Sequence, residues 1–345
     1  MNKAYTIDYA NIGLMILSCI IAFFIPFELF LFSYAILGPL HYLTEIGWLH
    51  QRQYFAKGKY DFLLLVFFGL LLFAAQFGFA KNLAGSSNKL ILLSFVTGCI
   101  IAFVKDYYLK IILVVVLLFS MFFVNSQNSY IYIFFGVFLP TLIHVFLFTA
   151  LFMLFGALKA RSWPGILSVV VLFGCAAALF LINPSQTYEI SDYVRESWFG
   201  FDKKGDAWGF VNLNIAVLDY FKVGTDLPAQ EGLARIEQLV FHTKAGFLLT
   251  RFVAFAYTYH YLNWFSKTSV IKWHKVDKRY LYATALLWLV AIGTYMYNYA
   301  TGLKVLFLLS FMHVLLEFPL NFQSFVGIGK EARNMFAGKK TGITN

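Results

Sequence analysis

Long apolar runs dominate this chain and limit it to folds that a lipid bilayer permits. Inside lipid only helices and closed barrels satisfy their backbone hydrogen bonds, and runs of roughly 17–25 residues match the length of a spanning helix. Only 13% of the residues are charged, against about 25% in soluble domains. The sequence therefore predicts an all-α, polytopic membrane bundle of about ten transmembrane helices, at residues 8–25, 29–50, 60–80, 88–104, 108–124, 130–158, 164–182, 246–266, 279–299 and 302–323.

Basic residues gather in every second loop between these runs. Most of the 27 Lys and Arg residues lie on the side of the bundle that also holds both chain ends. Because cytoplasmic loops of membrane proteins are rich in Lys and Arg, we expect both termini in the cytoplasm and the chain in a bacterial-type inner (plasma) membrane. The same bias accounts for the net charge of +10 without nucleic acid as a partner.

One polar segment, residues 183–245, interrupts the series of apolar runs. It divides the chain into helices one to seven (1–182), an extracytoplasmic loop (183–245), helices eight to ten (246–325) and a cytoplasmic tail (326–345). A single surface helix is expected near its end, with Thr225 or Asp226 as cap and Pro228 in its first turn. We expect the loop to be either a solvated linker or a lid. The lid is an alternative because the helix carries an apolar stripe of Leu233, Ile236, Leu239 and Val240.

Four histidines fall near the centres of apolar runs: His41, His144, His260 and His313. They belong to predicted helices two, six, eight and ten, which all cross in the same direction, and their depths agree to within roughly 5 Å at 1.5 Å per residue. A buried imidazole needs a partner, and a shared metal ion would serve all four. The remaining histidines, His50, His242 and His274, are predicted to lie outside this layer.

Two carboxylates follow these histidines by one helical turn, Glu45 after His41 and Glu317 after His313. Each could bind the metal directly or accept the N–H of a ligating histidine, and we favour the second role. Imidazole suits Zn, Cu, Fe and Ni. Oxygen chemistry on an apolar substrate favours non-haem Fe(II), with haem or Zn as alternatives. Aromatic residues nearby are predicted to line a substrate tunnel or to pack: Tyr42, Tyr257, Tyr259 and Trp264.

The blocks "GPLHYLTE", "TLIHVF", "YTYHYLNW" and "FMHVLLEF" together resemble the Brp/Blh family of membrane carotene dioxygenases. The family pattern has Gly at the position of Tyr42 and an acidic residue after the second histidine, which this chain lacks. The acidic residue of the family's fourth block lies one position later than Glu317. The resemblance implies non-haem iron on the four histidines and oxidative cleavage of a carotenoid.

Three functions remain open on these observations. The first is an O2-dependent oxygenase that takes dioxygen and an apolar, lipid-like polyene as substrates, with Glu45 and Glu317 assisting catalysis. The second is a haem-binding or haem-modifying membrane protein. The third is a metal-ion or proton transporter that uses the histidines and glutamates as a relay.

Overall fold

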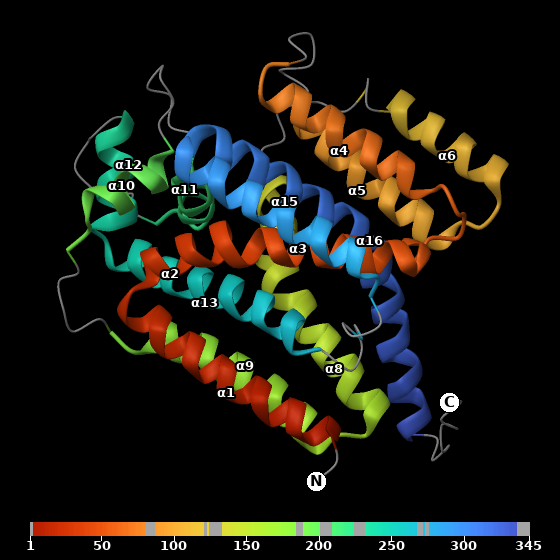
Figure 1. The fold of residues 1–345 in the computed structure, drawn as a ribbon, viewed down its shortest axis with the longest axis horizontal. Helices are drawn as coiled ribbons and strands as arrows, with labels where there is room; N and C mark the ends of the chain where they lie inside the picture. The colour runs from red at the N-terminus through yellow and green to blue at the C-terminus, as the bar shows by residue number, and fades with distance from the viewer. Residues whose placement is uncertain are drawn as a thin grey trace.

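The computed structural model describes residues 3–79, 87–120, 123, 133–183, 189–200, 209–223, 232–267, 272 and 276–336. The elements within these ranges are helices (Figure 1). In chain order they are α1 (Lys3–Phe24), α2 (Pro26–Phe32), η1 (Ser33–Leu37), α3 (Gly38–Gln51), η2 (Gln53–Phe55), α4 (Phe62–Gln76), α5 (Ser87–Phe103), α6 (Tyr107–Ser120), η4 (Phe134–Phe148), α8 (Thr149–Ala160), α9 (Trp163–Leu181), α10 (Asp192–Phe199), α11 (Val211–Tyr220), α12 (Gly232–Phe241), α13 (Lys244–Ser266), α15 (Lys278–Tyr297) and α16 (Tyr299–Phe336).

Several of these helices suit a membrane. Six described spans are long and apolar enough to cross a bilayer, and the bent pair α12–α13 makes a seventh if it is one span. Helices α4, α5 and α6 are apolar but shorter, with 15, 17 and 14 residues. A helix therefore occupies each of the ten predicted segments, and the chain is a multi-pass helical membrane protein by length and composition. The count of ten crossings stays a prediction.

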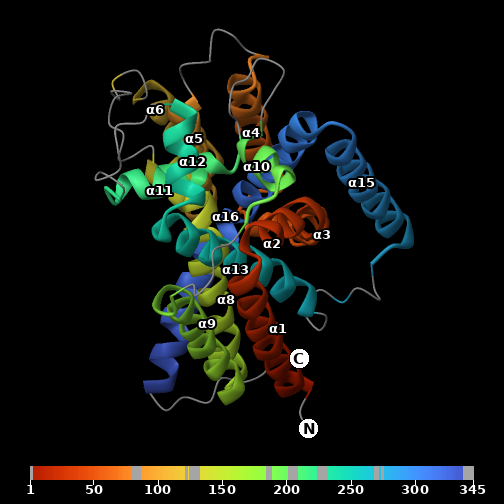
Figure 2. The same ribbon diagram turned by 90° about the vertical axis from the view of Figure 1, so that its left-hand side faces the viewer.

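Two helices, α13 and α16, form the centre of the bundle. Helix α13 packs against α1, α2, α3, α9, η1 and η4, whereas α16 packs against α3, α4, α5, α8 and α15. Figure 1 shows α13 between α2 and α3 on one side and α1 and α9 on the other, and Figure 2 shows α1 and α9 side by side below it. Most side chains of α13 are buried. Its Arg, His and Asn residues would be costly against lipid, which explains why other helices surround it.

Irregular helical turns lie close to two of the histidines. The π-helical segment η1 precedes Pro39, and the π-helical η4 contains Pro140. A proline removes one backbone donor and its ring displaces the preceding turn, and a wider turn accommodates both effects. By contrast, α16 runs through Pro319 as one helix. The helices of His41 and His144 thus each carry a proline in or beside a π-helical segment.

The segment 183–245 differs from its prediction as a loop with a single helix. It contains the three helices α10, α11 and α12, which gather at one end of the molecule, on the left in Figure 1. Trp198 of α10 is fully buried against Phe27 and Phe30 of α2. Leu239 and Val240 of the predicted stripe are buried, while Leu233 is exposed. The predicted cap at Thr225, Asp226 and Pro228 lies outside the described residues.

The C-terminal boundary also differs from its prediction. Helix α16 continues to Phe336, whereas the sequence placed the end of the last helix at 323 and a tail from 326. The extension carries polar residues, so a prediction from apolar residues ends the helix too early. The extension still packs on the bundle, because Gly327 lies against the Phe155 ring.

The close approach of the first turn of α16 to the end of α15 requires glycine at position 302. A Cβ atom there would lie 2.2 Å from the Tyr295 Cα atom, whereas a Cβ atom at Gly293 meets nothing within 4 Å. We therefore expect Gly302→Ala to lower the free energy of unfolding by about 1–3 kcal/mol through overpacking. The matched variant Gly293→Ala should be neutral or slightly stabilising. Thermal unfolding in detergent measures both, and equal midpoints for the two variants would contradict this packing.

Candidate metal centre

Four different elements bring the predicted histidines together. His41 lies on α3, His144 on η4, His260 on α13 and His313 on α16. All four are buried, with at most 7% of each side chain exposed. Their similar predicted depth was the reason to expect a cluster, and in the structure the four side chains are in contact. His50 and His242 lie elsewhere and are exposed, and His274 lies outside the described residues.

The imidazole rings form a closed four-membered arrangement. Neighbouring ring centroids are 4.7 Å apart for His41–His260, 5.0 Å for His260–His144, 5.0 Å for His144–His313 and 5.1 Å for His313–His41. The Nε2 atoms face inward, because those of His144 and His313 are 3.1 Å apart, as are those of His260 and His41. The four inner nitrogens therefore form two close pairs on the inner side of the ring circuit.

Hydrogen bonds on the outer side fix the tautomer of two rings. The Nδ1 atom of His313 lies 2.6 Å from the Ser310 carbonyl, which can only accept, so Nδ1 carries the proton. The Thr149 hydroxyl donates to the Val145 carbonyl at 2.9 Å and lies 2.7 Å from Nδ1 of His260. Since a hydroxyl has one hydrogen, His260 donates from Nδ1. Both rings thus direct an Nε2 lone pair into the centre.

Two buried carboxylates lie on the inner side of the rings. Oε2 of Glu45 is 3.1 Å from Nε2 of His41, and Oε2 of Glu317 is 3.5 Å from Nε2 of His144. Glu317 thus makes its short contact with a histidine of another helix. We expected each carboxylate to support the outer N–H of a histidine. The observed contacts favour direct participation at the inner volume, because they are made with Nε2.

Two overlapping sets of side chains have the spacing of metal ligands. The ligand atoms of His41, His260 and His313 lie within 4.8 Å of one another, as do those of His144, His313 and Glu317. His313 belongs to both sets. The outer Nδ1 atoms of His41 and His144 have no hydrogen-bond partner among the described residues. The donor set of imidazole nitrogens and carboxylate oxygens is one that binds Zn, Cu, Fe or Ni.

The predicted aromatic residues have separate positions. Tyr42 stacks on His313 with ring centroids 4.4 Å apart, and its hydroxyl lies 2.5 Å from that of Tyr261. Trp264 lies beside His41, with centroids 5.6 Å apart, and donates its indole N–H to Thr44. The side chains of Tyr42, Tyr261 and Trp264 cover the centre on one side and restrict the access of water.

Tyr257 and Tyr259 lie farther from the centre. The Tyr257 ring packs on Phe30 at a centroid distance of 5.1 Å. The Tyr259 hydroxyl donates to the Met153 sulfur at 3.4 Å, away from the imidazoles. None of the three described pockets is lined by these tyrosines or by the four histidines. Tyr257 and Tyr259 are packing residues in this structure, and none of these pockets forms the predicted tunnel along them.

Thr149 and the Ser310 carbonyl are site groups that the sequence did not reveal. Thr149 is five residues after His144, but it supports His260 on a different helix. That contact depends on how α8, which begins at Thr149, is rotated against α13. A threonine within reach of a mid-helix histidine is the only signal that the sequence carries.

Removing the acceptor of His260 tests this geometry. Thr149→Val keeps the shape of the side chain but leaves Nδ1–H without a partner, so we expect metal affinity at the centre to fall roughly 10–100-fold. Thr97→Val is the matched control, because Thr97 is buried and its hydroxyl has no hydrogen-bond partner among the described residues. Metal retention against increasing chelator measures both variants. Equal retention would remove Thr149 from the centre.

Comparisons of the chain with protein-family models, curated proteins and solved structures found no match. A helical bundle supports many unrelated chemistries, so the atoms of the site indicate the function better than the fold does.

Proposed function

We propose that the histidine centre holds one non-haem iron ion and that the protein is a membrane-embedded, O2-dependent oxidoreductase. Its proposed substrate is an apolar polyene such as a carotenoid, which it cleaves oxidatively. The observation that carries the proposal is the inward arrangement of four buried imidazoles, with Nε2 pairs at 3.1 Å.

The electrostatics of the inner volume support a bound cation. The Nε2 atoms of His260 and His313 carry lone pairs, and each lies 3.1 Å from the Nε2 atom of His41 or His144, so a bound cation would replace these two N–H···N contacts with ligand bonds. Four neutral imidazoles leave the charge of a divalent ion uncompensated. Glu45 and Glu317, which are 3% and 2% exposed, supply negative charge at the same place. A metal ion would therefore satisfy all six groups at once.

The size of the centre supports a single ion over haem. Neighbouring rings are 4.7–5.1 Å apart around a closed circuit. The circuit has room for one ion held by a set of three or more of these side chains, with His313 common to both sets, and it is too narrow to contain a porphyrin without separating the helices. Iron is preferred over zinc because the proposed reaction is a redox reaction, and zinc has no redox chemistry.

The protein groups have distinct roles in this proposal. When bound, the iron would supply the redox chemistry with dioxygen. Ser310 and Thr149 orient the rings of His313 and His260 through their Nδ1 hydrogens. Glu45 and Glu317 balance charge and can hold a proton beside the reacting groups. Tyr42 and Trp264 restrict water, which favours an apolar substrate over a polar one.

Two observations support a polyene as the class of substrate. The first is the aromatic shell of Tyr42, Tyr261 and Trp264 around the centre. The second is the resemblance of the four histidine blocks to the carotene dioxygenases.

Metal analysis of the detergent-purified protein tests the proposal. We expect about one iron per chain in the natural sequence, no Soret band, and loss of the iron in His144→Ala, because this change removes one ligand from a shared site. His242→Ala is the control, since that histidine is exposed and outside the centre. Absence of stoichiometric metal, or equal iron in His144→Ala and His242→Ala, would refute the metal centre.

The reaction itself needs a second measurement on the same samples. Supplied with a carotenoid and dioxygen, the natural sequence should bleach the polyene absorbance and consume oxygen, and His144→Ala should do neither. An iron-loaded protein that leaves carotenoids intact would keep the centre but reject this substrate class. Zinc in place of iron would reject the redox chemistry.

A further inference from the structure

One face of α16 carries polar side chains away from the metal centre. Beyond His313, the polar residues on this face are Glu317, Asn321, Ser324 and Glu331. Side chains three, four or seven residues apart lie on the same side of an α-helix, because the helix repeats every 3.6 residues. These four residues form the α16 stripe, which begins at the centre, where Glu317 contacts a histidine.

Asn321 is the most deeply buried member of the α16 stripe. It is 1% exposed, and neither its Nδ2 atom nor its Oδ1 atom has a hydrogen-bond partner among the described residues. The buried Oε2 atoms of Glu317 and Glu331 likewise accept no hydrogen bond there. Buried polar atoms without partners are costly, so the stripe has the chemistry of a site whose occupant is a polar or charged species.

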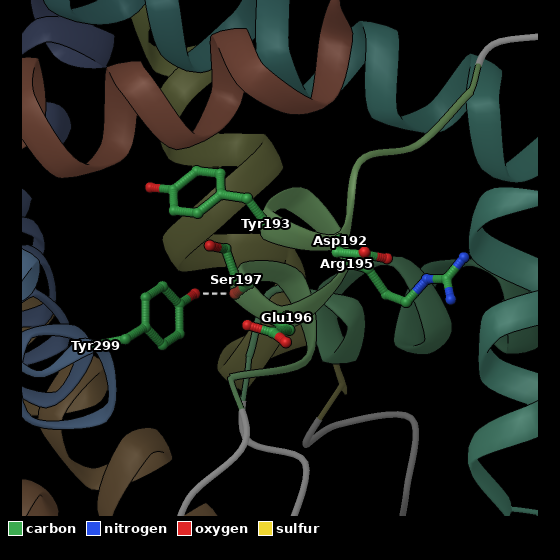
Figure 3. Close-up of a pocket in the computed structure, with 6 residues that line it drawn as sticks. All are labelled: Asp192, Tyr193, Arg195, Glu196, Ser197 and Tyr299. Atoms are coloured by element: carbon green, nitrogen blue, oxygen red, sulfur yellow. Dashed lines mark hydrogen bonds between the residues drawn. The ribbon is translucent and has the colours of Figure 1, made fainter.

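The central helices of the bundle all begin at the end of the molecule formed by α10, α11 and α12. Helix α16 begins at Tyr299, whose hydroxyl donates to the Ser197 carbonyl of α10 (Figure 3). The span of α3 begins with α2, which packs on Trp198 of α10, and α13 directly follows α12. The residues that follow the histidines therefore lie on the opposite side of the centre, toward the start of α1 and the end of α16 (Figure 1).

Polar groups lie on this opposite side of the centre on all three helices. On α3, Glu45 follows His41 by four residues. On α13, Asn263 follows His260 by three residues, is 8% exposed, and its Oδ1 atom has no hydrogen-bond partner in the described part of the chain. The stripe supplies the polar groups of α16. Carboxylate and carbonyl oxygens bind divalent cations, so this side of the centre suits the passage of a metal ion.

The side of the centre that faces α10 is aromatic instead. The aromatic residues there contact one another, with ring centroids 4.7–6.1 Å apart: Phe30, Tyr34, Phe210 and Tyr257. These rings supply no carboxylate to replace the hydration of a metal ion. A pocket of about 560 Å³ at α10 is lined by Tyr299, but Tyr299 precedes His313 by fourteen residues, which is about 21 Å of helix.

We propose that a divalent iron ion reaches the centre along the α16 stripe, from the end of the molecule that carries the start of α1 and the end of α16. Glu331, which is partly exposed, receives the ion, and Asn321 passes it to Glu317. The side of entry is the one that the sequence predicts to be cytoplasmic. This inference rests on the proposed function, because only a metal-binding centre needs to be loaded.

The burial of Asn321 makes loading a slow step. Asn321, Glu317 and the four histidines are closed to solvent, so the ion passes only when α16 and its neighbours open locally. While the ion passes, the carbonyl oxygen of Asn321 replaces part of its hydration shell. An apolar side chain of similar size at this position would leave the ion without that contact.

The rate of iron uptake tests the route. Fe(II) is added without oxygen to the metal-free, full-length protein in detergent, a chelator stops the uptake at set times, and mass spectrometry measures the bound iron. Asn321→Leu should take up iron at least roughly tenfold more slowly, because the ion loses one contact to a polar group. The final iron content should not change, since Asn321 belongs to neither ligand set. Asn321→Asp should restore the rate.

Gln323→Leu is the matched control. It removes an amide from the same helix, but that amide donates to the Phe55 carbonyl and lies off the stripe. Its uptake rate should equal that of the natural sequence. Equal rates for Asn321→Leu and Gln323→Leu would overturn the proposal. A lower final iron content of Asn321→Leu at an unchanged rate would also overturn it, because Asn321 would then belong to the centre.

The side of entry can be measured on the natural sequence, so the proposal stays testable if Asn321→Leu does not fold. The protein carries a protease-cleavable tag at its C-terminus and is reconstituted into vesicles, with Fe(II) supplied only outside. The fraction of chains that load iron should equal the fraction whose tag is cut by protease added outside. Loading of all chains, or of the uncut fraction only, would contradict entry along α16.

These measurements also separate the route from the proposed function. If the natural sequence takes up no iron in detergent or in vesicles, the metal centre itself is refuted. If it takes up iron at a rate independent of Asn321 and from both sides of the membrane, the centre stands and the route along α16 is refuted.

Discussion

The contact among four buried imidazoles is the interaction on which the arrangement of the helices depends. Helices α13 and α16 carry His260 and His313 through the middle of the bundle, and α3 and η4 bring His41 and His144 to them. A mid-membrane imidazole has no water to replace a missing partner. Each ring must therefore face another polar group: the Nε2 atoms face the other rings and the two glutamates, and the Nδ1 atoms of His260 and His313 face Thr149 and the Ser310 carbonyl.

Other buried charges in the described part of the chain show how unusual this centre is. Lys110 pairs with Asp61 at 2.5 Å. The Arg251 guanidinium lies 3.7 Å from the Phe23 ring centroid and donates to the Ile182 carbonyl. Lys110 is thus balanced by an opposite charge, and Arg251 is held by an aromatic ring and a carbonyl. Glu45 and Glu317 instead contact His41 and His144, and the proposed metal ion would supply the positive charge that balances these carboxylates.

The sequence was sufficient for features that depend on one helix, and insufficient for those that depend on two. Apolar length located the helices, and the shared depth of the histidines predicted their meeting. The contact of Glu45 with His41 follows from the four-residue spacing. The contacts of Glu317 with His144 and of Thr149 with His260 depend on how neighbouring helices rotate and cross. The helices α10 and α11 escaped prediction because their apolar stretches are short and buried by tertiary packing.

The span from Pro26 to Gln51 joins the α10 contact to the metal centre through its irregular middle. A π-type turn inserts an extra residue and so rotates everything that follows around the helix axis. Here the inserted turn, η1, lies between α2, where Phe27 and Phe30 pack on Trp198, and α3, which carries His41. A regular helix would change the rotation between these two faces, so the π turn allows one span to hold the α10 helix with its first half and the metal centre with its second.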